Sequence, residues 1–402
     1  MLSYEAALDR LLKLVPTPQQ NTAVPLANAL GRYLAQPPVA RIDLPPFDNS
    51  AMDGWAVRAE EIHPVPVRLQ IAGRVAAGGT YSTPLQPGHA VRVFTGSPIP
   101  PGANAVVMQE DATWTPAEPD SVLVHAPVKP WEHVRFRGED CHAGTRLVAP
   151  GTRLGAAHLA YLGAAGVDFV SVFPALSVTV LPNGSELVSP GQPLPAGAIY
   201  ESNSLALASL IAQIGAQVRT QPPPPDDSSA LRGALMAAFA ESNVVITVGG
   251  ASVGDHDLVK STFESVGGRL EFWRVAIKPG KPFFFGELET ANGRKFLFGV
   301  PGNPVSAFVT TVMLVLPALR RLLGASELLP PMQLGRLTEA LANPEARRHL
   351  IRVRCGVDGS VRSSGAQGSH FLSSLAASNG LVDVPPHTHW AAGTDVRVIG
   401  WD

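Results

Sequence analysis

The sequence predicts a multidomain protein of the α/β plus β class, in which the central domain is built on a mostly parallel sheet. Between residues 176 and 323, short apolar runs rich in β-branched residues alternate with helical stretches, as in parallel α/β domains. Residues 64–136 alternate short Val, Ile and Leu runs with Pro/Gly turns, which is typical of an all-β insert. The tail from Pro330 to Asp402 again has short strand-like runs around Pro and Gly.

The helical elements are expected outside and between these strands. Residues 3–15 form an amphipathic helix with Ser3 as its N-cap, and a second helix is expected around Pro25–Ala35, where Pro37 and Pro38 end it. A Gly-rich connection at 137–173 carries a helical stretch at 156–162. The apolar stretch 305–319 is too short for a membrane span and contains polar residues, so it predicts a buried helix.

Composition limits the function classes. The chain has 402 residues, 45% hydrophobic content and a net charge of −2, which predicts a soluble protein of two to four domains. No basic patch indicates nucleic-acid binding, and nothing indicates a membrane. We expect a cytoplasmic, reducing compartment, because no signal peptide is visible and the two cysteines, Cys141 and Cys355, cannot form a disulfide framework.

Five strand-like runs are predicted in the α/β region, at 177–182, 216–221, 243–248, 270–277 and 295–300, and each is followed by a loop built from Gly, Pro, Asp, Glu or Lys. The carboxyl ends of parallel strands meet at one edge of a sheet, so these loops are expected to line one crevice. The loops are NGSE (183–186), PPPPDD (222–227), GGASVGDHD (249–257), KPGKP (278–282) and PGNP (301–304).

The residues of these loops suit an anionic ligand and a hard metal ion. Glycines let backbone N–H groups approach a phosphate, lysines add positive charge, and carboxylates are the ligands that Mg²⁺ takes together with water and phosphate. Any one of these residues is more often a turn residue or a solvated side chain, but here they recur at equivalent topological positions. They are Gly184, Gly249, Gly250, Gly254, Gly280, Gly302, Lys278, Lys281, Glu186, Asp226, Asp227, Asp255 and Asp257.

Several long motifs occur along the chain, and some are polar segments outside the α/β region that individually would be interpreted as turns or caps. The motifs are PPFDNSAMDGWAV (45–57), VFTGSPIPPGANAVVMQED (93–111), RGED (137–140), GGASVGDHD, IKPGKPFFFG, GVPGNPVSA and GAQGSHFLSSLAASNG. In this order and at these spacings they resemble the molybdopterin molybdenumtransferase family, which includes MoeA and the gephyrin E domain, and the resemblance covers essentially the whole chain.

The resemblance implies an architecture and a reaction. The protomer would have a segmented linker domain (1–45 and 137–175), a β-rich domain (46–136), a three-layer α/β domain (176–326) and a C-terminal β-barrel (327–402). Members insert molybdenum from molybdate into the dithiolene of adenylylated molybdopterin, with Mg²⁺-dependent release of AMP. They are homodimers whose sites are shared between protomers, and contact with a molybdopterin adenylyltransferase is expected.

The resemblance also implies roles for individual residues. Asp53, Thr95, Asp140 and Lys278 would be catalytic, and Asp257, Asp226 and Glu186 would hold the metal. Substrate binding would fall to Gly184, Glu186, Gly249, Gly250, Ser252, Gly254, Arg274, Lys281, Pro301, Pro304 and Ser369. His256 and His370 are further ligand candidates, although a loop histidine more often only forms hydrogen bonds.

Departures from the family pattern leave the metal ligands open. Ser185 stands where relatives usually carry a carboxylate, Arg274 replaces a lysine of some relatives, and the prolines before Asp226 obscure its placement. Two other functions remain: an adenylyltransferase, which would lack the β-rich and C-terminal domains, and a scaffold protein like the gephyrin E domain. The sequence does not decide between molybdate and tungstate.

Overall fold

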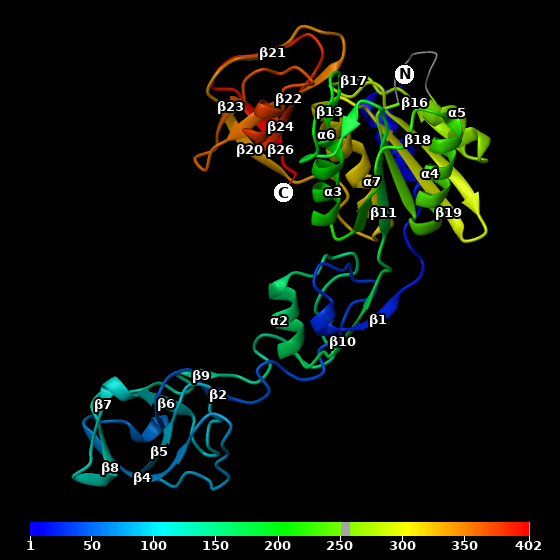
Figure 1. The fold of residues 1–402 in the computed structure, drawn as a ribbon. Helices are drawn as coiled ribbons and strands as arrows, with labels where there is room; N and C mark the ends of the chain where they lie inside the picture. The colour runs from blue at the N-terminus through cyan, green and yellow to red at the C-terminus, as the bar shows by residue number, and fades with distance from the viewer. Residues whose placement is uncertain (251–257, 402) are drawn as a thin grey trace.

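The computed structural model of the protein describes residues 1–250 and 258–401. Three regions follow one another in space: a β-rich region, a narrow linker region, and the α/β domain with the C-terminal barrel beside it (Figure 1). The α/β domain and the barrel lie at one end of the molecule, and the β-rich region lies at the other.

The α/β domain is built on a six-stranded sheet in the order β14-β11-β15-β19-β18-β16. Strands β14, β11, β15 and β19 are parallel, whereas β18 is antiparallel to both of its neighbours. The mostly parallel sheet is therefore confirmed, but β18 was missing from the runs identified in the sequence. The strands are β11 (Ser177–Pro182), β14 (Gln217–Thr220), β15 (Val244–Val248), β16 (Arg269–Trp273), β18 (Phe284–Thr290) and β19 (Gly293–Val300).

Helices cover both faces of this sheet and make the three-layer arrangement. One core contains the buried residues of α3 (Asn203–Gln213) and of the continuous helix α6 (Pro304–Thr310), η4 (Thr311–Val315) and α7 (Leu316–Leu322). The other core contains those of α4 (Ser228–Glu241) and α5 (Leu258–Ser265). The segment Pro304–Leu322 has the length and composition of a membrane span, but 83% of its apolar stretch is buried, as predicted for a core helix.

The N-terminal helix α1 (Tyr4–Leu14) belongs with the α/β domain. Ser3 caps it as predicted, accepting a hydrogen bond from the Ala6 N–H at 3.1 Å. Its buried residues Ala7 and Leu11 join the α/β core, which differs from the placement of residues 1–45 in the linker domain. The physical reason is the apolar face of the helix, which is stabilised by burial against α7.

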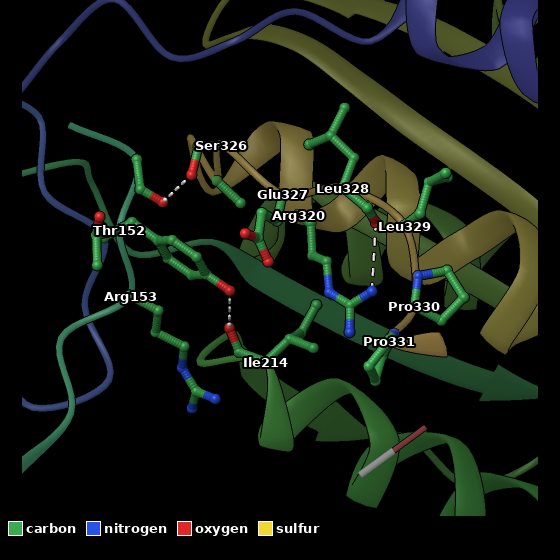
Figure 2. Close-up of a pocket in the computed structure, with 13 residues that line it drawn as sticks. Thr152, Arg153, Ile214, Arg320, Ser326, Glu327, Leu328, Leu329, Pro330 and Pro331 are labelled. Carbon is green, nitrogen blue, oxygen red and sulfur yellow. Dashed lines mark hydrogen bonds between the residues drawn. The ribbon is translucent and has the colours of Figure 1, made fainter. Parts of the chain in front are cut away.

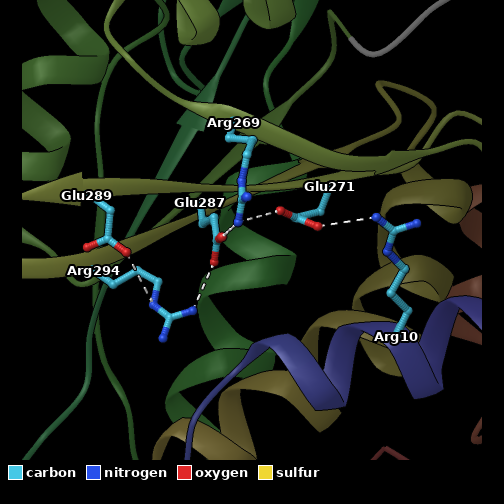
Figure 3. Close-up of polar contacts among 6 residues, drawn as sticks. All are labelled: Arg10, Arg269, Glu271, Glu287, Glu289 and Arg294. Atoms are coloured by element: carbon cyan, nitrogen blue, oxygen red, sulfur yellow. Dashed lines mark hydrogen bonds and ion pairs between the residues drawn. The ribbon is translucent and has the colours of Figure 1, made fainter.

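Charged side chains also tie α1 to the edge of the sheet (Figure 3). Arg10 pairs with Glu271 on β16, and Arg269 contacts both Glu271 and Glu287. Glu287 on β18 is buried and also pairs with Arg294 of β19 at 3.1 Å. Burial raises the pKa of the Glu287 carboxyl, but the two arginines outweigh this effect, and the net pKa is lowered.

The predicted run at 270–277 is not one strand. Arg274 has a left-handed backbone, with φ of 67°, and it separates β16 from β17 (Ile277–Lys278). Strand β17 then pairs with β22 (Arg348–Cys355) of the C-terminal region. The loop after Lys278 is therefore held by the junction of two domains and not by the α/β sheet alone.

The C-terminal region is the predicted barrel. Strand β22 pairs with both β23 and β24, and the order β22-β23-β20-β26-β24 closes on itself. Its strands are β20 (Met332–Leu337), β22, β23 (Ser360–Ser363), β24 (Gly380–Val384) and β26 (Asp395–Ile399). The pair β21 (Leu341–Asn343) and β25 (Thr388–Trp390) and helix α8 (Leu372–Ala376) complete it.

The β-rich region is a six-stranded sheet in the order β6-β3-β5-β4-β8-β7. Its strands are β3 (Gly54–Val57), β4 (Val67–Val75), β5 (His89–Val93), β6 (Ala105–Met108), β7 (Ala112–Thr115) and β8 (Glu118–Val124). Short strands β2 (Asn49–Ser50) and β9 (Val134–Arg135) pair where the chain enters and leaves this region.

The linker region brings two distant segments together. Strand β1 (Thr22–Pro25) pairs with β10 (Phe169–Val172), beside helix α2 (Ala156–Ala164), which matches the predicted helical stretch. The helix expected around Pro25–Ala35 was wrong, because only a single turn, η1 (Leu26–Asn28), forms there. The backbone of residues 31–34 instead forms hydrogen bonds with the backbone of residues 152–154. These N–H and C=O groups are therefore not free to form the hydrogen bonds of a longer helix.

Candidate functional site

A crevice of about 610 Å³ opens at the carboxyl ends of the parallel strands. The loops after β11, β15 and β19 contribute Asn183, Glu186, Gly249, Gly250 and the Pro301–Pro304 segment. Asn203, at the start of α3, donates a hydrogen bond to the Gly302 carbonyl at 2.7 Å and fixes the last of these loops. The expected meeting of the strand-end loops is therefore observed for these three, and the 278–282 loop reaches the crevice through Pro282.

Backbone conformation and lack of space both require glycine at two positions of the crevice. Gly249 and Gly250 both have positive φ, 85° and 66°. A Cβ on Gly249 would lie 2.6 Å from the Asn183 carbonyl oxygen, and one on Gly250 would lie 2.5 Å from Val259. Only a bare backbone fits, and this leaves room for a ligand to approach the peptide groups closely.

Two of the expected metal-binding carboxylates lie around the 183–186 loop. Glu186 lines the crevice and folds over Gly184, whose added Cβ would meet the carboxylate oxygen at 2.6 Å. Asp226 accepts a hydrogen bond from the Ser185 N–H at 3.1 Å. Asp227, by contrast, caps helix α4 through the N–H groups of Ser229 and Ala230, so its carboxylate has a local structural partner.

The metal site as a whole is not assembled among the described residues. Within residues 1–250 and 258–401, no group of three or more His, Cys, Asp or Glu side chains has the arrangement of a metal site. Asp257 lies outside the described residues, as do Ser252, Gly254, Asp255 and His256. Glu186 and Asp226 supply hard oxygen donors that suit Mg²⁺, which retains waters and phosphate oxygens in its shell.

A smaller, cationic hollow of about 260 Å³ adjoins the crevice, and Pro282 lines both. Lys278, Lys281 and Arg347 line it together with the hydroxyl residues Ser306 and Ser369. The α/β domain and the barrel therefore both contribute to its wall. Such a set of cations and hydroxyl groups is suited to a small oxyanion.

Contacts between domains hold this hollow in shape. Lys278 forms an ion pair with Glu345 of the barrel, next to the β17–β22 pairing. The buried guanidinium of Arg352 donates to the carbonyls of Ala366, at 2.7 Å, and Gly368, at 3.1 Å. The loop that carries Ser369 is therefore anchored from inside the barrel.

Asp53 and Thr95 lie side by side in the β-rich region. Asp53 directly precedes β3, and Thr95 lies in the loop that follows β5. The Thr95 N–H and hydroxyl both donate to the same Asp53 oxygen, at 2.8 and 2.9 Å. The backbone hydrogen bond from Thr95, followed by its hydroxyl, lowers the pKa of the Asp53 carboxyl. This carboxylate remains charged to lower pH than an isolated aspartate.

The remaining predicted site residues are dispersed. Asp140 is exposed at the junction of the linker and β-rich regions, where its N–H bonds to the Leu44 carbonyl at 3.0 Å. Arg274 lines neither the crevice nor the hollow in the described part of the chain, because its guanidinium lies over the Trp273 ring at 3.7 Å. His370 lines the crevice and contacts Phe371, with 4.1 Å between ring centroids.

Sequence reasoning missed Glu345 and Arg347, as well as Asn203. Nothing in the local sequence around Glu345 and Arg347 separates them from surface charges, because Arg347 reaches the hollow, and Glu345 reaches Lys278, only through the docking of the barrel. Asn203 was detectable in principle, since it follows Ser202 at the start of a helix that returns to the sheet.

A second large cavity, of about 660 Å³, lies between the linker region and the α/β domain (Figure 2). Tyr33 donates there to the Ile214 carbonyl at 3.1 Å, and Arg320 donates to the Leu328 carbonyl at 3.3 Å. Glu327 also lines this cavity, and its carboxylate partly balances the positive charge of Arg320. Of the predicted site residues that the structure describes, none lines it.

Comparison with known proteins covers nearly the whole chain. Three family models match in sequence: MoeA N-terminal region (domain I and II) at residues 2–166, a probable molybdopterin binding domain at 179–321, and MoeA C-terminal region (domain IV) at 335–401. The molybdopterin molybdenumtransferase of Haemophilus influenzae is 35% identical over 94% of this chain and 93% of its own length. Molybdopterin molybdenumtransferase 2 of Mycobacterium tuberculosis is 38% identical over 94% of both.

Solved structures agree with this result. A crystal structure of the molybdopterin biosynthesis moeA protein from Pyrococcus horikoshii superposes with a TM-score of 0.83 and 31% identity, covering 100% of both chains. A second structure of that protein gives a TM-score of 0.79 at 31% identity, covering 100% of this chain and 99% of the other.

Proposed function

The chain belongs to the molybdopterin molybdenumtransferase family of molybdenum cofactor biosynthesis, and from this premise we propose that it releases AMP from adenylylated molybdopterin in a Mg²⁺-dependent step as molybdenum enters the dithiolene. The observation that carries the proposal is the position of the cationic hollow directly beside the glycine-lined crevice. Two adjoining sites of this kind suit a nucleotide-tagged substrate and a small oxyanion that reacts with it.

The crevice is assigned to the nucleotide end of the substrate. Gly249 and Gly250 line it without side chains, although the Gly249 N–H already bonds to the Val300 carbonyl at 3.1 Å. Pro301 and Pro304 also line it. Phosphate groups are commonly held by such loops at strand ends.

The cationic hollow is assigned to molybdate. A tetrahedral dianion requires several positive or hydrogen-bonding groups, which Lys278, Lys281, Arg347 and Ser369 provide. Lys278 also forms an ion pair with Glu345, and this pair keeps the ammonium group in place before the anion binds. Tungstate has the same charge and shape, and a competition assay would measure the preference.

Mg²⁺ is assigned to the side of the crevice where Glu186 and Asp226 lie, with Asp257 as the further expected ligand. When bound there, the ion would neutralise charge on the bridging phosphate. The residues of the chain supply the carboxylates and orient the 183–186 loop through the Ser185–Asp226 hydrogen bond.

Asp53, Thr95 and Asp140 are assigned to the same reaction through a homodimer. Within one protomer the β-rich region lies at the far end of the molecule from the α/β crevice (Figure 1). A second copy offers a way to bring the β-rich region of one protomer to the crevice of the other, and we propose this arrangement in a cytoplasmic enzyme. Direct delivery of the pterin by an adenylyltransferase is part of the proposal.

Molybdate-dependent AMP release from adenylylated molybdopterin tests the function. Activity should require molybdate and Mg²⁺, and formation of the adenylylated pterin from ATP should not occur. The shared site is tested by mixing Asp53→Asn and Lys278→Gln proteins at a molybdate concentration too low for turnover by the Lys278→Gln protein alone, because exchanged dimers would contain one site with both residues intact. Confirmed subunit exchange without recovered activity would contradict the dimeric site, and pterin binding without turnover would favour a scaffold function.

A further inference from the structure

The β-rich region contains a cavity of about 680 Å³. Strands β3, β4, β5 and β7, and Phe94 directly after β5, contribute its principal lining residues. These are Trp55, Ile71, Arg74, Arg92, Phe94 and Trp114, which together define the Trp114 groove.

Aromatic rings and guanidinium groups alternate along the groove. The Arg74 guanidinium lies 4.7 Å from the centroid of the Phe94 ring, and that of Arg92 lies 5.0 Å from the same ring. Arg92 also lies 5.2 Å from the Trp55 ring. Trp114 completes the wall and is 49% exposed, so a large aromatic surface remains available to a ligand.

Two arginines and no carboxylate line the groove in the described part of the chain. Arg68, on the same strand as Arg74, forms an ion pair with Glu118. Neither Arg74 nor Arg92 has a carboxylate oxygen within 4.0 Å among the residues that the structure describes. Burial lowers the pKa of the Arg92 guanidinium, while the more distant Asp53 raises it, so this cation is partly desolvated without a direct counter-ion.

The groove is connected to the Asp53–Thr95 pair by short contacts. Phe94 directly precedes Thr95. Arg92 donates to the Gln109 side-chain oxygen at 2.7 Å, and the Gln109 N–H donates to the Asp53 carbonyl at 3.0 Å. A ligand in the groove would therefore have its end close to the proposed catalytic carboxylate.

We propose that the Trp114 groove is the subsite for the pterin end of the substrate, where the flat heterocycle adjoins the anionic dithiolene. The heterocycle can stack on the exposed indole, and the two arginines favour the neighbouring negative charge. This inference rests on the proposed function and deepens it, because it separates the pterin end, held by the β-rich region, from the nucleotide end, held by the α/β crevice.

Equilibrium dialysis of the full chain with two probes tests this division. Pterin-6-carboxylate represents the planar anion, and AMP represents the nucleotide end. Replacement of Trp114 by Ser should weaken pterin-6-carboxylate binding about tenfold, as expected for loss of one stacking partner, and leave AMP binding unchanged. Trp114→Phe retains a ring and should restore most of the affinity.

A second substitution separates charge from stacking. Arg74→Met should weaken the binding of pterin-6-carboxylate by a similar factor and make the remaining binding less sensitive to salt. The matched control is Arg68→Met, which removes an arginine from the same strand that is already paired with Glu118 and should leave both probes unaffected.

The outcomes distinguish this inference from the proposed function. Unchanged pterin-6-carboxylate binding in both Trp114→Ser and Arg74→Met, or no binding of this probe to the unmodified protein, would overturn the subsite. Parallel loss of AMP binding would assign the groove to the adenine ring instead and would also overturn it. Failure of the proposed function would be seen separately, as absent molybdate-dependent AMP release by the unmodified protein.

Discussion

Asp53 and Lys278 are held in two very different ways. Asp53 receives both hydrogen bonds from Thr95, a residue of the same small sheet region. Lys278 lies on a short strand that leaves the α/β sheet, pairs with the barrel and forms an ion pair with Glu345. The first site is complete within one domain, whereas the second exists only when two domains are docked.

This difference predicts different consequences of mutation. Changes around Asp53 should alter chemistry with little effect on folding, because the pair is exposed and local. Changes around Lys278 should couple ligand binding to the stability of the junction between the α/β domain and the barrel. The following predictions test this contrast.

The largest effect is expected for Asp53→Asn. Removal of a catalytic carboxylate should reduce molybdate-dependent AMP release by about 10³-fold, while binding of adenylylated molybdopterin remains nearly intact. Single-turnover kinetics and calorimetric titration measure the two quantities. Asp120→Asn, an exposed position on β8, controls for loss of one negative charge in the same region. Equal losses of binding and turnover would remove the distinction between the two sites.

A smaller effect is expected for Lys278→Gln. Loss of one charge-assisted contact should raise the molybdate concentration for half-maximal activity by about 10- to 100-fold. Lys13→Gln, which removes an exposed lysine paired with Asp9 on α1, is the control. An unchanged molybdate dependence would show that the anion binds elsewhere, and the assignment of the hollow would be wrong.

The junction should also lose stability at acid pH through His349. Burial, and then the nearby Lys278, lower the pKa of His349 to about 4, although Glu345 opposes this. The folded protein binds this proton less readily than the unfolded chain, so stability is full above about pH 6.5 and falls as pH decreases toward 4. The free energy of unfolding should decrease by about 2 kcal/mol between pH 7.5 and pH 5.

Denaturant unfolding of the unmodified protein and of His349→Gln at both pH values checks this contribution. The variant is expected to lose about 2 kcal/mol less over the same interval. Identical pH dependence of the two proteins would show that His349 is not the titrating group.

The smallest effect is expected for Thr95→Val. This change removes the hydroxyl hydrogen bond to Asp53 but retains the N–H bond, so the pKa of Asp53 should rise part of the way toward its ordinary value. The acid limb of the pH–activity profile should then move to higher pH. Thr95→Ser keeps the hydroxyl and should behave like the unmodified protein, and a common shift in both variants would exclude this hydrogen bond as the cause.

Several features were readable from local sequence. The period of apolar residues and the Ser3 cap predicted α1, and the β-branched runs predicted the parallel strands and the crevice loops that follow β11, β15 and β19. The long motifs identified the family. These features depend on short-range backbone preferences and on the pattern of apolar faces, which neighbouring residues largely determine.

The tertiary structure decided which of these pieces meet. Strand β18 escaped prediction because its run of phenylalanines, glycine and glutamate is stabilised by pairing with β19 and by the arginines around Glu287. The pairing of β17 with the barrel, the entry of Arg347 into the hollow and the ion pair of Glu345 with Lys278 likewise have no local signal. Sequence by itself determined the elements and the chemical groups they carry, whereas packing between distant segments determined the cavities, because the free energy of docking depends on all contacting surfaces together.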